Sequence, residues 1–113
     1  MQLLGNEFDF SFTDIDDLER FEQAYAQLQD IPESGTQVQT LRAQCAGIRA
    51  FLEDVLGAGA YEVLVTKPND IACNLSALYA FADAYEAAAD ELKEMQAQRE
   101  RRLAKYAVGK RRK

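Results

Sequence analysis

The sequence predicts a mainly α-helical protein: a small domain of three to four helices, with a short N-terminal β-hairpin and a long C-terminal helix. Three observations support this fold class. Apolar residues recur at spacings of three and four over most of the chain, which is the helical period. They alternate with polar residues only near the N-terminus, as in a half-buried strand. Hydrophobic residues make up 48% of the 113 residues, enough for one modest core.

The first twelve residues or so are expected to form the hairpin. Gly5-Asn6 suits a two-residue turn between Leu3-Leu4 and a second strand over residues 7–12. The three phenylalanines of that strand alternate with polar residues, so one face is apolar. Because a lone hairpin is marginal in water, this face should pack on helices. An edge offered to a partner's strand is the alternative.

The first helix is expected to begin at Thr13, whose hydroxyl can cap the free amides of the first turn. It should end near Asp30, because Pro32 disfavours helical geometry at the residue before it. Residues 32–35 are then a loop. The expected apolar stripe of this helix is Ile15, Leu18, Phe21, Tyr25 and Leu28.

A second helix is expected from about Thr36 to Leu56, with Gly57 as its C-terminal stop. The segment 61–65 follows as one or two helical turns, or as a strand because of its valines. The apolar stripe of the second helix is Val38, Leu41, Cys45, Ile48, Leu52 and Leu56.

A long last helix should be capped by Asn69 or Asp70 and continue to about Tyr106. Gly109 is expected to end it, leaving residues 110–113 mobile. This helix carries two apolar stripes, which indicates either neighbours on two sides within the domain, or the domain on one side and another subunit of a homo-oligomer on the other. Solvated alanine, a strong helix former, explains the second stripe equally well. The large residues are Ile71, Leu75, Leu78, Phe81 or Ala82, Tyr85, Leu92 and Met95, and the small ones are Cys73, Ala77, Ala80, Ala84, Ala87 and Ala88.

Charge divides the chain into a helical domain over residues 1–98 and a basic C-terminal extension over residues 99–113. The extension has eight Lys/Arg and one acid, whereas the domain has five Lys/Arg and eighteen Asp/Glu. Such asymmetry points to an interaction role for the extension. The candidate partner-binding residues are Ala77, Ala80, Ala84, Ala88, Arg99, Arg102, Leu103, Tyr106, Lys110, Arg111 and Arg112.

No pattern in the sequence indicates catalysis or a cofactor. The chain has no histidine and only two cysteines, without a CxxC motif, so common zinc sites and histidine bases are excluded. The acidic run 14–19 has Leu18 and Glu19 where a calcium loop needs an oxygen ligand and a glycine. Gly57-Ala58-Gly59 lacks the rest of a phosphate-binding loop. We therefore expect no enzyme, no metal and no cofactor.

The kind of partner is narrowed by charge and by hydropathy. The longest weakly polar run, residues 71–82, is too short to span a bilayer, and the start does not resemble a secretory signal. A cytoplasmic protein without a membrane partner is expected. The acidic body repels polyanions, and the extension has one aromatic residue for stacking, which disfavours nucleic acid. A protein partner is the preferred interpretation, and a solubilising tail is the alternative.

Three segments resemble a known group of proteins: the opening stretch 4–22, the stretch Phe51–Gly57, and the ending Lys105-Tyr106 with its basic tail. Together they resemble the small proteins encoded in the tail modules of tailed phages and prophages, where tail assembly chaperones are found. The resemblance extends over most of the chain and includes no catalytic signature.

The resemblance implies a non-enzymatic tail assembly chaperone in the cytoplasm of a bacterial host. Such a chaperone keeps the long, helical tape measure protein soluble until tail-tube subunits polymerise around it. The tape measure protein is then the expected partner, and the tail-tube protein is a second candidate. A structural component of the virion is the first alternative, and a small nucleic-acid-binding regulator is a weaker one.

Overall fold

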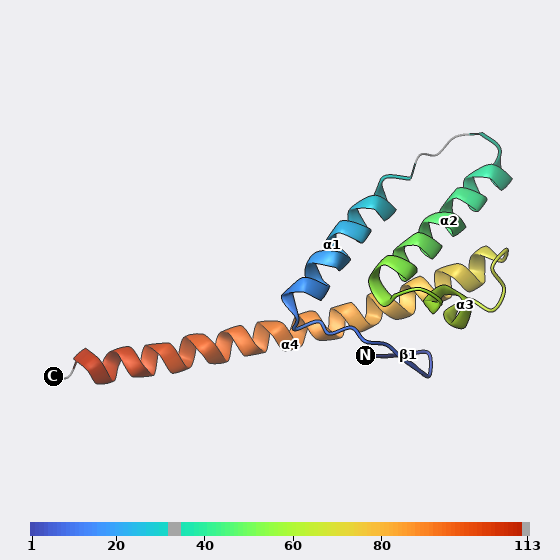
Figure 1. Cartoon of the computed structure of the whole chain (residues 1–113). Helices are drawn as coiled ribbons and strands as arrows, with labels where there is room; N and C mark the ends of the chain where they lie inside the picture. Colours follow the sequence, from blue (N-terminus) through green and yellow to red (C-terminus); the bar gives the residue numbers. More distant parts are fainter. Residues whose placement is uncertain (32–34, 112–113) are drawn as a thin grey trace.

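The protein consists of a helical body from which one long helix projects (Figure 1). The computed structural model describes residues 1–31 and 35–111, with side chains as far as Tyr106. The molecule measures 71 × 31 × 20 Å. The predicted fold class is confirmed. The elements are β1 (Gln2–Leu3), β2 (Asn6–Glu7), α1 (Ile15–Gln29), α2 (Gln37–Leu56), α3 (Ala60–Leu64) and α4 (Ile71–Arg111).

The hairpin turns one residue earlier than predicted. β1 and β2 pair antiparallel with Leu3 opposite Asn6, so the turn is formed by Leu4 and Gly5, with φ angles of 49° and 81°. This register places Leu3 in the core, where it is 5% exposed. Burial of one side chain sets the register here, because a slip by one residue turns every side chain to the other face. The turn propensity of Gly5-Asn6 is overridden.

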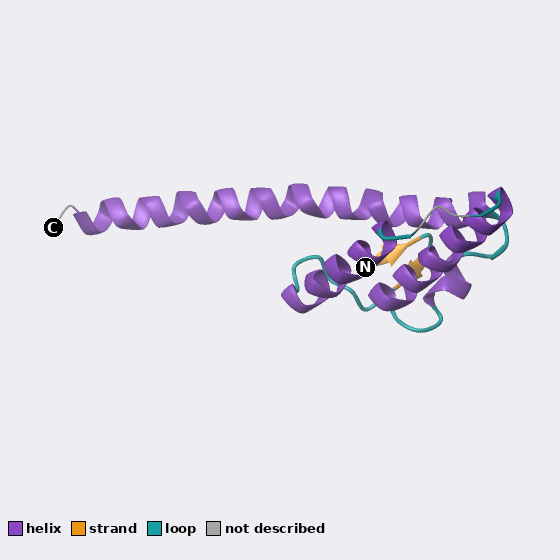
Figure 2. Cartoon of the chain, turned by 90° about the horizontal axis from the view of Figure 1, so that it is seen from above, coloured by secondary structure: helices purple, strands orange, loops and turns teal. Residues whose placement is uncertain are grey.

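The second strand is also shorter than predicted, because the chain bends after β2. The amide of Phe10 donates to the carbonyl of Phe8 at 2.9 Å, which is a local turn and no ladder bond. The three phenylalanines nevertheless pack on the helices as expected. Phe10 is buried, and Phe8 and Phe12 pack against the core at its edge. Figure 2 shows the strand pair among the helices of the body.

α1 is capped by Asp14 and not by Thr13, so the prediction is wrong by one residue. The Asp14 carboxylate accepts from the amide of Asp17 at 3.1 Å, and the Thr13 hydroxyl is instead 2.9 Å from that of Ser11. A carboxylate in this place also interacts favourably with the positive end of the helix dipole, because it carries a negative charge and a hydroxyl does not. Ile15, assigned to the buried stripe, is 77% exposed.

The ends of α2 lie where the sequence predicts them. Thr36 and Gln39 form a capping box, in which each side chain bonds the other's amide. Gly57 ends the helix with φ 103°, a backbone conformation that favours glycine. The buried side of α2 is centred on Ile48, Phe51, Leu52 and Val55, and Val38, expected in the stripe, is 60% exposed.

The segment after α2 is the short helix α3, so the helical alternative is confirmed. Asp70 is the cap of α4, since its side chain accepts from the amide of Ala72 at 2.9 Å. α4 continues to Arg111, and Gly109 therefore lies within the helix and does not end it. One glycine costs a helix only about 1 kcal/mol. Of the segment expected to be mobile, residues 110 and 111 are helical, and 112–113 lie outside the described residues.

One buried polar residue holds the start of α4 against α3. Asn74 is 0% exposed, and its amide nitrogen donates to the carbonyls of Pro68 and Asp70 at 3.1 and 2.8 Å. Its side-chain oxygen accepts from the Tyr61 hydroxyl at 2.7 Å. Because every polar atom of this side chain has a partner, its burial is tolerated. The loop between α3 and α4 is fixed by these bonds.

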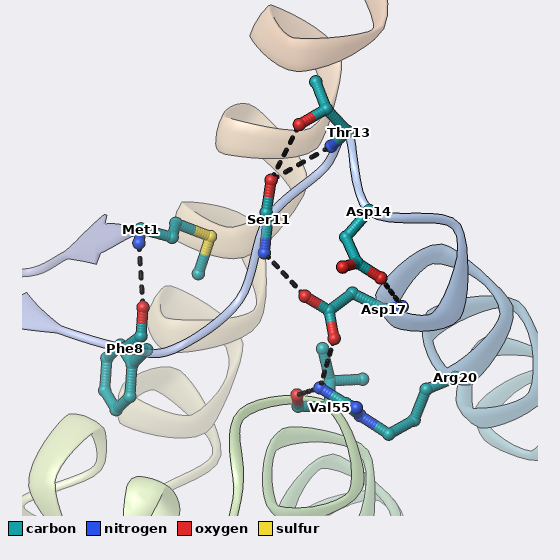
Figure 3. Close-up of polar contacts among 8 residues, drawn as sticks. All are labelled: Met1, Phe8, Ser11, Thr13, Asp14, Asp17, Arg20 and Val55. Carbon is teal, nitrogen blue, oxygen red and sulfur yellow. Dashed lines mark hydrogen bonds and ion pairs between the residues drawn. The ribbon is translucent and has the colours of Figure 1, made fainter.

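A polar joint fastens the hairpin segment and α1 to the end of α2 (Figure 3). The Asp17 carboxylate accepts from the amide of Ser11 at 2.9 Å and lies 3.1 Å from the Arg20 guanidinium. Arg20 also donates to the carbonyl of Val55 at 3.0 Å. That carbonyl is one of the last four of α2, which lack partners within the helix. Arg20 therefore acts as a C-terminal cap supplied by a neighbouring helix.

Candidate protein-binding groove

A groove of about 660 Å³ is lined mainly by residues of α1 and α4, two helices that diverge from the start of α1 (Figure 1). We call it the tyrosine groove. Its most buried lining residues are Phe81 of α4 and Phe51 of α2, which are 1% and 3% exposed. The lining residues are Phe21, Glu22, Tyr25, Ala26, Leu28, Gln29, Phe51, Leu78, Tyr79, Phe81, Ala82, Tyr85 and Glu86.

The walls of the tyrosine groove are stacked aromatic rings. Phe21 of α1 stacks on Tyr85 and Phe81 of α4, with ring centroids 4.8 and 5.6 Å apart, and on Tyr25 at 5.8 Å. Tyr25, Tyr79 and Tyr85 remain 45%, 57% and 39% exposed. Tyrosine offers a large apolar ring and a hydroxyl with few rotatable bonds, which is why it is enriched in binding surfaces.

Charge around the tyrosine groove is negative. Among its described lining residues the charged ones are Glu22 and Glu86, one on each wall. Neither carboxylate is part of an ion pair that the described side chains form. The groove therefore suits an occupant with an apolar strip flanked by basic side chains.

The small-residue stripe of α4 lies mostly against the body. Ala77 is 0% exposed and belongs to the core, so it is not available to a partner on this surface. Ala80 and Ala84 are half-buried against the same core, and Ala88 is half-buried further along. The small residues let α2 and the hairpin approach α4 closely, which is a packing role.

The other predicted site residues lie on the projecting part of α4. Leu103 and Tyr106 are 51% and 65% exposed, and Arg99 and Arg102 are exposed beside them. Lys110 and Arg111 continue the helix without described side chains, and Arg112 lies outside the described residues. Thirteen residues of helix, about 20 Å, separate Glu86 from Arg99. The structure does not bring the basic segment and the tyrosine groove together within one chain.

Sequence reasoning missed the tyrosine groove. Tyr25 and Tyr85 were assigned to buried stripes, and Tyr79 was not singled out. A signal was available: α1 and residues 71–85 of α4 carry five aromatic residues, whereas α2 carries one. Only the divergence of the helices decides which rings stay exposed.

A second, smaller groove lies between α2 and the start of α4. It encloses about 460 Å³ and is lined by Val38, Leu41, Arg42, Cys45, Ala46, Arg49, Tyr61, Pro68, Asn69 and Ile71. Burial, with the charge of Asp70, raises the pKa of the Cys45 thiol against the opposing charge of Arg42. A hydrogen bond from the backbone of Lys67 lowers the pKa of the Cys73 thiol. These opposite shifts favour the thiolate form at Cys73 over Cys45, the other free cysteine.

The described part of the chain, residues 1–31 and 35–111, contains neither a metal-binding cluster nor a membrane-spanning helix. No group of three or more His, Cys, Asp or Glu side chains is placed to hold a metal ion. No described helix is both long enough and apolar enough to cross a bilayer.

Comparison with sequence families places nearly the whole chain in one of them. A profile described as "Family of unknown function (DUF6673)" matches residues 4–113. The chain belongs to this family. No curated protein sequence and no solved structure was found to match it. The DUF6673 description names no activity, so the resemblance to phage tail-module proteins stays a prediction, and the tyrosine groove is the feature on which a function can be argued.

Proposed function

We propose that this member of the DUF6673 family is a non-enzymatic tail assembly chaperone that binds the tape measure protein during phage tail morphogenesis. The observation that carries the proposal is the tyrosine groove, an exposed aromatic surface on an otherwise charged protein. The resemblance of the sequence to tail-module proteins supplies the identity of the partner. The bacterial host cytoplasm is the proposed place of action, and the tail-tube protein is a second candidate partner.

The shape of the tyrosine groove suits a helix. Two helical walls that diverge from a common floor accept an amphipathic helix, which inserts its apolar stripe between them. Tyr25 and Tyr79 stand on opposite walls, so both rings can contact such a helix. Burial of these rings would supply most of the binding energy. A long helical tape measure chain offers many segments of this kind.

Co-expression with a tape measure protein, whose gene the proposal expects to lie nearby, tests the proposal. We expect the two proteins to co-purify and the tape measure protein to become more soluble. Ala82→Arg places a long charged side chain in the tyrosine groove at an exposed position, and it should abolish the complex. Ala87→Arg is the matched control, because Ala87 is exposed on the same helix but does not line the groove.

Two results would contradict the proposal. Failure to co-purify, with no gain in solubility, would exclude the tape measure protein as partner. Recovery of the protein from mature particles, in a fixed ratio to the tail-tube subunits, would favour a structural role, because a chaperone leaves before the particle is complete.

A further inference from the structure

The charge of α4 reverses along its length. Residues 71–98 of the helix carry five acidic residues and one lysine, whereas residues 99–111 carry six Lys/Arg and one acid. The ion pair between Arg101 and Glu94, 3.0 Å long, links the two parts at their junction. Arg99 and Arg102 form no ion pair among the described side chains. The helix thus has an acidic part, which packs on the body as far as Tyr85, and a basic part, all of which projects.

One line of side chains runs through both halves at spacings of three and four. Its first members, Leu78 to Tyr85, lie in the tyrosine groove, and its last members are exposed on the projecting half. This spacing is typical of the line of contact between two helices that pair along their length. The line is Leu78, Ala82, Tyr85, Ala89, Leu92, Gln96, Arg99, Leu103 and Tyr106.

We propose that two copies of the protein pair antiparallel through α4, so that residues 99–106 of each copy lie in the tyrosine groove of the other. Leu92 then lies on the two-fold axis. In this arrangement the basic half of each helix runs beside the acidic half of its partner. A parallel pair would put like charges together at both ends, which is destabilising.

The lengths agree with this register. Leu78 and Tyr106 are each fourteen residues from Leu92, about 21 Å along the helix. An antiparallel pair therefore sets Tyr106 of one copy beside Leu78 of the other, and Leu103 beside Ala82. The span from Leu92 on the two-fold axis to Tyr106 therefore equals the span from Leu92 to Leu78 at the far end of the tyrosine groove.

Charge supports the same register at the groove. Arg99 of one copy comes beside Tyr85 and Glu86 of the other, where the guanidinium can pair with the carboxylate and lie on the ring. Arg102 comes beside Asp83. These acidic and basic side chains are exposed in the single chain, and pairing gives each a partner of opposite sign. An interface with two-fold symmetry forms both contacts twice and closes the assembly at two chains.

The pairing does not depend on the proposed function, since its test uses no other protein. Sedimentation equilibrium of the full chain should show a reversible dimer. Arg99→Glu should weaken the dimer about tenfold or more, and the added Glu86→Arg change should restore it. Arg42→Glu makes the same charge change at an exposed site on α2 outside the tyrosine groove, and it should leave the dimer intact.

Cysteine cross-linking tests the orientation. With Cys45 and Cys73 replaced by alanine, Leu92→Cys should give a disulfide-linked dimer under mild oxidation. Leu103→Cys should not, because an antiparallel pair holds these two positions about 33 Å apart, far beyond the reach of a disulfide. Circular dichroism would confirm that both variants remain helical.

A monomer at all concentrations would overturn the pairing. Equal cross-linking at positions 92 and 103 would show a parallel pair. An unchanged dimer in Arg99→Glu would show that residues 99–106 do not enter the tyrosine groove. Residues 99–106 of a second copy and a tape measure helix would occupy the same groove in turn, the first in the free protein and the second in the complex. The outcomes above concern the free protein, so they leave co-purification with the tape measure protein untouched, and the two proposals fail separately.

Discussion

The two halves of α4 belong to one continuous helix but are held in different ways. Between Asn74 and Tyr85 the helix packs against the hairpin and α2, and Phe81 is 1% exposed. From Met95 to Tyr106 it projects into solvent, and its large apolar side chains, Met95, Leu103 and Tyr106, are 51–65% exposed. Most helical stability in proteins comes from packing of one face. The first half obtains that packing from its own chain, and the second half must obtain it from helix propensity or from another chain.

The largest expected effect is from deleting the ring at the centre of the packed half. Phe81→Ala should destabilise the body by about 3–5 kcal/mol, because it leaves a cavity where four aromatic neighbours meet. Met95→Ala is the matched change in the projecting half, at a side chain that is 52% exposed, and it should have little effect. Urea unfolding measures both. A similar loss in both variants would mean that the projecting half is also packed.

The next effect concerns the point where α4 joins the body. Asn74→Ala should cost about 2–3 kcal/mol, because it leaves the buried Tyr61 hydroxyl and the Pro68 carbonyl with fewer partners. The projecting half should keep its helical circular dichroism signal at temperatures where the variant body is still folded. A neutral result in urea unfolding would show that water replaces the amide.

A smaller effect on the free energy of unfolding distinguishes two arginines, Arg20 in the body and Arg101 in the projecting half of α4. Arg20→Ala should cost about 1 kcal/mol, because Arg20 caps α2 through the Val55 carbonyl and is only partly screened by solvent. Arg101→Ala removes an ion pair whose two side chains are 62% and 71% exposed, and the unfolding midpoint should not move. If Arg101→Ala were the more damaging change, the projecting half would be the better packed of the two.

The smallest expected effect is a loss of stability at alkaline pH that arises from Tyr61, a residue of the body. Burial, with the nearby Cys45, raises the pKa of Tyr61 above its ordinary value of about 10. The folded state thus favours the neutral phenol. Tyr61 therefore makes its full contribution to the free energy of unfolding below about pH 10, and this contribution is lost as the pH rises through the pKa of Tyr61 in the folded state. The free energy of unfolding should fall less steeply between about pH 9 and 11 in Tyr61→Phe than in the parent protein. Equal slopes would assign the loss to other groups, since Cys45 titrates in both proteins.

Much of the fold could be predicted because local signals were strong. The start of α2 at Thr36 and its stop at Gly57 were predicted, and the cap of α4 was narrowed to Asn69 or Asp70. Each of these ends is held by bonds to backbone within a few residues, so local sequence is enough to indicate them. The hairpin register and the cap of α1 were each wrong by one residue. In both places two neighbouring residues had similar propensities, and burial of Leu3 or a bond to Asp17 decided between them.

The candidate site depended more on tertiary structure. The spacing of the tyrosines predicted a buried stripe, and the small residues of α4 predicted a partner surface. In the structure these roles are largely exchanged: Ala77 is buried, and Tyr25, Tyr79 and Tyr85 are exposed. Periodicity identifies an apolar face but not what covers it, because coverage depends on where the neighbouring helix lies.

By itself, the sequence determined the fold class, the order of the three longer helices, both ends of α2, and the charge division between residues 1–98 and residues 99–113. These properties depend on residues close together in the chain. The tertiary structure decided that α1 diverges from α4, that the aromatic rings between them form a groove, and that the basic half of α4 lies about 20 Å beyond it. These properties depend on how rigid helices of unequal length pack against one another, since α4 is longer than the body that it crosses.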